Sequence, residues 1–302
     1  MQGMLLNPCD ATAAMSSCSA SPLFANKPTF SFEFFPPKTE EGAQSLLETV
    51  VKLQEFRPSF VSVTYGAGGG TSKYTVEIAA DLKEKFGVTS LAHLTCVASS
   101  REHVHRVVER LKEHEICNIM ALRGDIPKDG VIHHDYKYAS ELIAELKTLG
   151  DFCIGGACYP VGHVESATKA EDILHLKEKV NAGCDFLTTQ MFFDNDLLYN
   201  FLYQIREKGI MVPVVAGIMP VTNAKQMKRI LSMSGAYIPA KFRAIVDKFG
   251  DNPAAMRQAG VAYATDQIVD LIANGVNAIH VYSMNKPDVA AQIKSSLSEI
   301  IV

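Results

Sequence analysis

The fold can be built outward from the stretch FSFEFFPP at residues 30–37. Side chains along a β-strand alternate between two faces. The phenylalanines at the even positions therefore share one face, whereas Ser31 and Glu33 share the other. The two prolines end the strand, because proline cannot donate a ladder hydrogen bond. A buried carboxylate is costly unless it is paired or protonated, so Glu33 either faces water or belongs to a site that uses it.

Seven further runs have the composition of buried strands, and amphipathic helical patterns with apolar residues at i, i+3 and i+4 lie between them. Strands that alternate with helices form a parallel sheet, and eight such units close a (β/α)8, or TIM, barrel. The interval before the last strand contains more helix than one crossover needs, which predicts extra helices between strands seven and eight. The predicted strands cover residues 30–35, 60–64, 90–96, 117–122, 152–158, 185–190, 213–218 and 277–282.

The domain organisation follows from the same pattern. Residues 1–28 are small and polar and are expected to form a flexible N-terminal arm, and residues 29–302 are expected to form a single catalytic barrel domain. The alternative is an open doubly wound sheet, which usually carries G-x-G-x-x-G after its first strand. The nearest match, YGAGGGTS at residues 65–72, has Thr71 at the third glycine position and follows the second strand.

Composition excludes several classes of function. The 302 residues carry a net charge of −4, which gives no basic surface for nucleic acid. There is no apolar run of 18 residues, so no membrane span is expected. The cysteines form no C-x-x-C pair, which favours reduced, buried thiols in a cytoplasmic protein over a metal site or disulfides. These cysteines are Cys9, Cys18, Cys96, Cys117, Cys153, Cys158 and Cys184.

Polar residues gather where the predicted strands end, which is where barrel enzymes have their active sites. Each has a structural alternative: Glu33 can be an ion-paired acid, His93 a satisfied core histidine, and Asp125 a turn residue. Three polar residues at helical spacing, beginning at Asp172, can equally be a solvated helix face. The gathered residues are Glu33, Thr64, Tyr65, His93, Thr95, Arg123, Gly124, Asp125, Tyr159, His163, Thr188, Thr189, Gln190, Tyr282, Asn285 and Lys286, with Asp172, His175 and Lys179 on the helix.

Nine motifs that include these residues occur in a fixed order along residues 30–300. Together they resemble the methylenetetrahydrofolate reductase family of the bacterial, single-domain type. No single motif is sufficient, but nine in one order are highly specific. The motifs are FSFEFFPPK, FVSVTYGAGG, AHLTC, ALRGDIP, YASELI, CYPVGH, TTQMFFD, GIMPVTN and HVYSMN.

The resemblance implies a TIM-barrel oxidoreductase that holds FAD non-covalently at the C-terminal rim of the barrel. NADH or NADPH would reduce the flavin and leave, and 5,10-methylenetetrahydrofolate would then accept the hydride to become 5-methyltetrahydrofolate, a reaction of one-carbon metabolism and methionine biosynthesis. It also implies a cytoplasmic homo-oligomer that binds small molecules. In some relatives a partner protein delivers the electrons, so both sources of electrons remain open.

The resemblance also implies a role for each matched residue. Glu33 matches the general acid that protonates the substrate nitrogen N10, and Asp125 matches the aspartate beside the flavin pyrimidine. Gln190, Tyr282 and Lys286 match substrate-binding positions, together with Glu33. The positions that match cofactor-binding residues are Thr64, His93, Arg123, Gly124, Asp125, Tyr138, Ala139, Tyr159, His163, Asp172, His175 and Lys179.

Two residues depart from the family pattern. Lys286 stands where an arginine is common and loses the bidentate fork of a guanidinium, and Ala224 stands where an aromatic side chain often stacks on the nicotinamide or the folate. Two other functions are alternatives. One is another barrel enzyme, either a flavin-dependent oxidoreductase similar to proline dehydrogenase or an aldolase, and the other is a non-catalytic folate- or flavin-binding subunit of a larger complex. An aldolase would need a Schiff-base lysine at a strand end, which none of the predicted strands offers. A non-catalytic subunit would not need Glu33 and Asp125.

Overall fold

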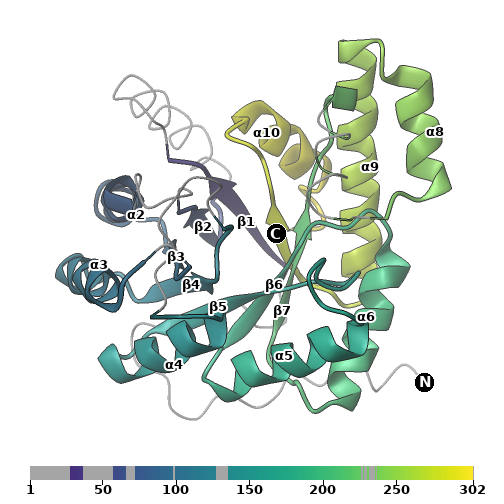
Figure 1. Cartoon of the computed structure of the whole chain (residues 1–302). Coiled ribbons are helices and arrows are strands. Elements are labelled where there is room, and N and C mark those ends of the chain that lie inside the picture. Colours follow the sequence, from purple (N-terminus) through teal and green to yellow (C-terminus); the bar gives the residue numbers. More distant parts are fainter. Residues whose placement is uncertain are drawn as a thin grey trace.

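The chain folds into a closed barrel of eight parallel strands, in which each strand pairs with its neighbours in sequence and β8 pairs with β1 (Figure 1). The structure is a computed structural model that describes residues 28–36, 57–65, 72–97, 99–126, 135–225, 227, 230, 235 and 237–301. The predicted TIM barrel is therefore confirmed. The strands are β1 (Thr29–Phe34), β2 (Phe60–Val63), β3 (Ser90–Thr95), β4 (Asn118–Leu122), β5 (Cys153–Cys158), β6 (Phe186–Thr189), β7 (Val214–Ile218) and β8 (Ala278–Val281).

The helices surround the barrel, and α8 and α9 supply the predicted extra helices between β7 and β8 (Figure 1). The helix α3 begins at Arg101, because the Ser100 hydroxyl accepts a hydrogen bond from the His103 backbone N–H and so caps a free helix donor. Of the arm expected at residues 1–28, residues 1–27 lie outside the described part of the chain. The described helices are α2 (Ser72–Phe86), α3 (Arg101–Glu113), α4 (Ala139–Leu149), α5 (Lys169–Asn181), α6 (Asn195–Glu207), α8 (Ala240–Phe249), α9 (Pro253–Ala273) and α10 (Pro287–Ser296).

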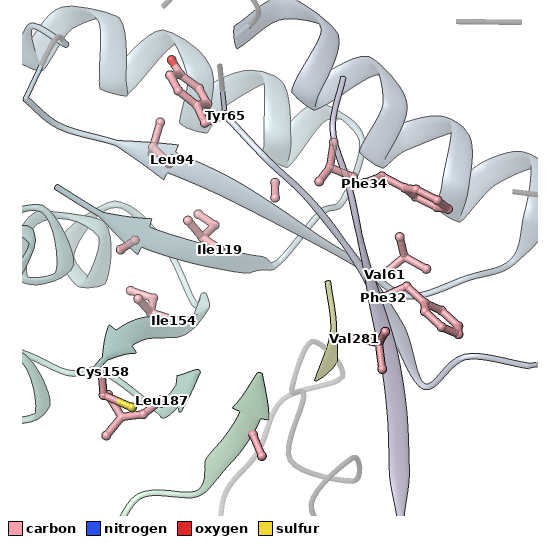
Figure 2. Close-up of a cluster of buried hydrophobic side chains, with 14 of the residues drawn as sticks. Phe32, Phe34, Val61, Tyr65, Leu94, Ile119, Ile154, Cys158, Leu187 and Val281 are labelled. Carbon is pink, nitrogen blue, oxygen red and sulfur yellow. The ribbon is translucent and has the colours of Figure 1, made fainter. Parts of the chain in front are cut away.

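The outward faces of the strands form the main hydrophobic core with the surrounding helices. Phe30, Phe32 and Phe34 all belong to this core, which confirms the face predicted for them. Figure 2 shows part of it, with Phe32 beside Val61 and Val281 from the two strands that flank β1. The phenylalanine face of β1 therefore packs against the helices, and the opposite face of the strand, with Ser31 and Glu33, lines the barrel interior.

The barrel interior has two layers of different chemistry. Near the N-terminal ends of the strands it is filled by a second apolar cluster, which includes Phe60, Leu91 and Phe186. Above this apolar layer, toward the C-terminal ends, the buried side chains are polar. This polar layer comprises Ser31, Glu33, Ser62, His93 and His280. The strand register places His280 opposite Ser31, and Glu33 opposite Ser62.

A third apolar cluster joins α8 and α9 to the segments that follow β6 and β7. In this cluster the rings of Phe193 and Phe242 stack with their centroids 5.2 Å apart. The Tyr263 hydroxyl donates to the Phe193 carbonyl at 2.6 Å, and the Gln267 side-chain amide donates to the Phe192 carbonyl at 3.3 Å. The extra helices therefore fix the chain just beyond Gln190.

Three sequence expectations can be compared with the described residues. Cys96, Cys158 and Cys184 are free and buried, as expected for reduced thiols, and Cys153 is buried as well, whereas Cys117 is disulfide-bonded, so the expectation is wrong for that residue. Within the described ranges, no group of three or more His, Cys, Asp or Glu side chains is arranged to hold a metal ion. None of the described helices combines the length and apolar character that a membrane crossing requires.

Candidate functional site at the C-terminal rim of the barrel

Glu33 points into the barrel from β1 and is only 8% exposed. Its Oε2 atom lies 3.9 Å from Nε2 of His93 on β3. Burial raises the pKa of Glu33 from 4.5 to about 8 and lowers the pKa of His93 from 6.5 to about 4, because desolvation disfavours both charged forms. At neutral pH the two groups are therefore a protonated carboxylic acid beside a neutral imidazole, rather than an ion pair.

His280 on β8 organises the polar layer beneath this pair. Its Nδ1 lies 2.8 Å from the Ser31 hydroxyl and its Nε2 lies 3.3 Å from the Ser62 hydroxyl. Because the Ser31 hydroxyl donates to the Ile279 carbonyl at 3.1 Å, it accepts from Nδ1–H, which leaves Nε2 to accept from Ser62. Burial, and secondarily His93, lowers the pKa of His280 to about 3, so this ring stays neutral.

Sequence reasoning missed His280, although one signal could have found it. Alternation along the predicted strand NAIHVY places His280 on the same face as Tyr282, two residues later. In the structure the two rings meet edge to face with their centroids 5.3 Å apart. The Tyr282 hydroxyl donates to the Thr189 carbonyl at 2.7 Å. Burial and, next, the proximity of Glu33 raise the pKa of Tyr282, so its hydroxyl remains a donor.

Gln190 and Lys286, the other predicted substrate-binding residues, lie on the loops that follow β6 and β8. The Gln190 backbone N–H donates to the Cys158 carbonyl at 2.7 Å, and its side-chain oxygen accepts from the Met191 N–H at 3.0 Å. The Lys286 ammonium donates to the Thr222 hydroxyl at 3.1 Å. Lys286 therefore bridges the loops after β7 and β8, and its partner Thr222 lies two residues before Ala224.

Arg123, which follows β4, is held by a carboxylate that the sequence did not single out. Its guanidinium donates to both carboxylate oxygens of Glu165, at 2.6 and 2.7 Å. This bidentate pair raises the pKa of Arg123 and lowers that of Glu165. The Glu165 backbone N–H donates to Nδ1 of His163 at 3.1 Å, so Glu165 links the His163 imidazole on the loop after β5 with the Arg123 cation on the loop after β4. Arg123 and Glu165 are 42 residues apart in the sequence, so no local sequence pattern could predict their pairing.

Two aromatic pairs extend this side of the rim. Tyr159 and His163 meet edge to face at 4.6 Å between centroids, and Tyr138 stacks with His175 at 6.4 Å. Burial, and then the nearby Asp172, raises the pKa of Tyr159 to about 12. The pKa of Tyr159 also responds to the charges of Arg123 and Asp125, and that of Tyr282 to Tyr159. Tyr159 and Tyr282 therefore lie between Arg123 and Glu33 in the chain of electrostatic interactions along the rim.

The predicted face of α5 points to this rim rather than only to solvent. The Ser166 hydroxyl donates to the Asp172 carboxylate at 3.4 Å, and the Lys179 ammonium donates to the Ala157 carbonyl at 2.9 Å. His175 is the ring that stacks on Tyr138. Burial lowers the pKa of Lys179. Lys179 is therefore half-buried and bonded to the barrel, whereas His175 is exposed, and the role predicted for these three residues stays a prediction.

The remaining predicted residues lie at the ends of β2 and β4 and at the start of α4. The Thr64 carbonyl accepts from the Thr75 hydroxyl at 2.9 Å. Gly124 has a φ of +84°, and a Cβ atom there would lie 2.9 Å from the Cβ of Thr95, so only glycine fits. Asp125 follows it on an exposed loop, and Ala139 is the buried first residue of α4. These residues frame the rim without contacting Glu33 directly in any described hydrogen bond.

Fold and site together define a TIM-barrel protein with a buried acid and a ring of cationic and aromatic groups at its C-terminal rim. The family model for methylenetetrahydrofolate reductase matches residues 20–298. The chain belongs to the methylenetetrahydrofolate reductase family.

Individual relatives agree with this family assignment. The 5,10-methylenetetrahydrofolate reductase of Pectobacterium carotovorum is 35% identical over 267 residues, covering 88% of this chain and 89% of that protein. Methylenetetrahydrofolate reductase (NADH) 1 of Arabidopsis thaliana is 35% identical over 286 residues, covering 90% of this chain but 48% of that protein. An uncharacterised Clostridium thermocellum protein described as binding two copies of 5-methyl-5,6,7,8-tetrahydrofolic acid has a TM-score of 0.64 at 14% identity, covering 91% and 96% of the two chains. That likeness supports the fold alone.

Proposed function

We propose that this chain reduces 5,10-methylenetetrahydrofolate to 5-methyltetrahydrofolate with non-covalent FAD and electrons from NADH or NADPH. The observation that carries the proposal is Glu33, a carboxylic acid buried in the polar layer with its pKa raised to about 8. A family that reduces a cyclic folate needs such an acid. FAD, when bound, would supply the two-electron carrier that links donor and folate in a ping-pong reaction.

Glu33 would protonate N10 of the folate, directly or through a water molecule. The five-membered ring of the substrate must open to an iminium before a hydride can add, and N10 can leave only if it gains a proton. A desolvated glutamic acid holds that proton near neutral pH. Gln190, Tyr282 and Lys286 would orient the pterin and the rest of the folate, and the negative charge of Asp125 would favour the cationic iminium.

The chemistry of the rim fits FAD. A dinucleotide needs cations for its diphosphate and flat surfaces for its rings, and the rim offers Arg123 and Lys179 together with two aromatic pairs. The Gly124 backbone is exposed to close approach because it carries no side chain. Other residues proposed to hold the cofactor are Thr64, His93, Asp125, Tyr138, Ala139, Tyr159, His163, Asp172 and His175.

Lys179→Met is expected to weaken FAD binding about 10- to 100-fold, the size of a lost hydrogen bond to a charged group. The apoprotein is titrated with FAD and the quenching of flavin fluorescence gives the dissociation constant. Lys177→Met is the matched control, since Lys177 is an exposed lysine of the same helix, and it should bind FAD like the unmodified protein. Equal dissociation constants for the two variants would remove Lys179 from the cofactor site.

The proposed function is tested by anaerobic stopped-flow absorbance of the flavin-loaded protein, mixed separately with NADH and NADPH. Bleaching of the flavin band, followed by its recovery on addition of methylenetetrahydrofolate, is the expected result and identifies the donor. If neither nucleotide bleaches the flavin but the chemically reduced protein is re-oxidised by the folate, electrons arrive through a partner protein, and Ala224 is the first residue to examine. Failure of the folate to re-oxidise the flavin would refute the proposal.

A further inference from the structure

The seam between β1 and β8 lies beside Glu33. The last paired residues across this seam are Phe32 and Val281. Beyond them β1 continues for two residues that pair only with β2, while β8 ends. Glu33 and the residues after it would therefore have an open flank on the β8 side. An open flank leaves backbone hydrogen-bonding groups unpaired and lets a strand end move.

Two side chains from the loop after β8 fill this flank. The Ser283 hydroxyl donates to the Glu33 carbonyl at 3.4 Å. Two residues further along the chain, the Asn285 side-chain oxygen accepts from the Phe35 N–H at 2.9 Å and its amide nitrogen donates to the Phe35 carbonyl at 3.0 Å. A carboxamide offers one acceptor and two donors, so Asn285 pairs with Phe35 as a residue of a neighbouring strand would.

This arrangement requires an unusual backbone. Met284 and Asn285 have φ angles of +54° and +56°. The left-handed conformation costs roughly 1–2 kcal/mol for an ordinary L-residue, and asparagine is among the few residues that adopt it routinely. Two such residues in succession persist only where their surroundings hold them. The hydrogen bonds to Phe35, together with the bond from the Lys286 N–H to the Ser283 carbonyl, hold this turn.

The same turn determines where Lys286 lies. Its backbone N–H donates to the Ser283 carbonyl at 3.0 Å, α10 begins at the next residue, and its ammonium reaches Thr222 on the loop after β7. One short segment therefore connects the strand that carries the candidate acid to a candidate folate-binding cation. Loosening the turn would free both at once.

We propose that Asn285 is a positioning residue that locks the β1–β8 seam and so keeps Glu33 and Lys286 in a fixed relation for the folate half-reaction. This role rests on the proposed function and deepens it, because it assigns the geometry of the folate step to a residue for which the resemblance implied no role. Asn285 does not contact the proposed reacting atoms. It acts through the backbone of β1 and the loop after β8.

The test compares Asn285→Gly with Met284→Gly. Glycine keeps the left-handed backbone available, so Asn285→Gly removes the carboxamide alone, whereas Met284→Gly relieves backbone strain and leaves the carboxamide. Asn285→Gly should slow re-oxidation of the reduced flavin by methylenetetrahydrofolate about 10- to 100-fold, as misplacement near a reacting centre does, and should leave reduction by the donor unchanged. Met284→Gly should leave both half-reactions unchanged.

A second measurement separates positioning from a general loss of structure. Loosening the seam admits water to Glu33, so its pKa should fall and the alkaline limit of the folate half-reaction should move to lower pH in Asn285→Gly. The titratable groups facing Glu33 are His93 from β3 and Tyr282 from the end of β8, with His280 beside His93; all three are retained. Unchanged folate kinetics with an unchanged pH profile would overturn the proposal.

Two further readouts keep the test decisive. If Asn285→Gly does not fold, Asn285→Asp, which keeps an acceptor for the Phe35 N–H but loses the donor to its carbonyl, should show a smaller loss in the same half-reaction. If Asn285→Asp instead re-oxidised at the rate of the unmodified protein, the proposed positioning role of Asn285 would be contradicted. Amide hydrogen exchange at Phe35 should accelerate in Asn285→Gly whatever the substrate is. Faster exchange without any folate reaction would contradict the proposed function alone, whereas unchanged exchange would contradict the role of Asn285 at the β1–β8 seam.

Discussion

Glu33→Gln is expected to slow the re-oxidation of the reduced flavin by methylenetetrahydrofolate at least about 10²-fold, the usual size of a lost general acid. Glutamine occupies the same volume but has no proton to give to N10. Reduction by the nicotinamide needs no such proton, so its rate should stay nearly the same. Anaerobic stopped-flow measurement of each half-reaction separates the two. Glu178→Gln, the same change at an exposed position on α5, is the matched control, and an equal loss in both half-reactions would contradict the assignment.

The pH dependence of the same variant gives an independent check. Glu33 binds its proton up to a pKa of about 8 in the folded protein and only up to 4.5 without burial. Between these values the folded chain holds a proton that the unfolded chain has lost, so the free energy of unfolding must fall as pH rises through this window. Glu33→Gln cannot ionise and should lose that dependence. Thermal unfolding at pH values between 4.5 and about 8 measures this dependence in both proteins. In the unmodified protein the folate half-reaction should also slow above a pH of about 8.

Gly260→Ala is expected to destabilise the fold by about 3 kcal/mol or more, as severe overpacking does. A Cβ atom on this residue of α9 would lie 1.9 Å from the carbonyl oxygen of Val221 and 2.8 Å from its carbonyl carbon. The obstacle is backbone, so no side chain can rotate away. Either α9 or the loop after β7 must move, and Thr222, which holds Lys286, moves with that loop. Chemical denaturation and the Michaelis constant for the folate measure the two effects.

Gly87→Ala provides the comparison for this second prediction. Gly87 has a φ of +62°, and a Cβ atom added there would have no other atom within 4 Å. Alanine at this position therefore meets only the cost of the left-handed conformation, about 1 kcal/mol. Its folate kinetics should be unchanged. If Gly260→Ala were no more destabilising than Gly87→Ala, the close approach of α9 to the loop after β7 would not describe the protein in solution.

The strands could be predicted from the sequence to within one residue at each end, for a physical reason. A strand buried on both sides is a short apolar run, and the predicted run 213–218 corresponds to β7 at Val214–Ile218. Alternation also gave the face of Glu33. The exact end of a strand depends on where the neighbouring strand stops pairing with it, and the sequence of one segment does not contain that information.

The partners of the site residues were beyond the sequence for a related reason. His280 and Ser31 are 249 residues apart, and Asn285 and Phe35 are 250 apart, because barrel closure brings the last strand to the first. A local pattern gives the face on which a side chain lies, but the side chain opposite comes from another strand in a register that no local pattern contains. The bond between Arg123 and Glu165 could not be predicted for the same reason. The family resemblance supplied roles for single positions and left these pairings unstated.

The layered interior of the barrel places the residues that stabilise the fold apart from those of the candidate site. The apolar cluster that includes Phe60, Leu91 and Phe186 near the N-terminal ends lies below the candidate site, and the polar layer above it contributes little hydrophobic burial. A population of random variants should therefore divide by depth along the barrel axis: changes in the lower cluster reduce yield and heat resistance, whereas changes in the upper layer leave a well-folded protein with altered turnover. New specificity could be selected in the upper layer while the lower cluster keeps the scaffold intact.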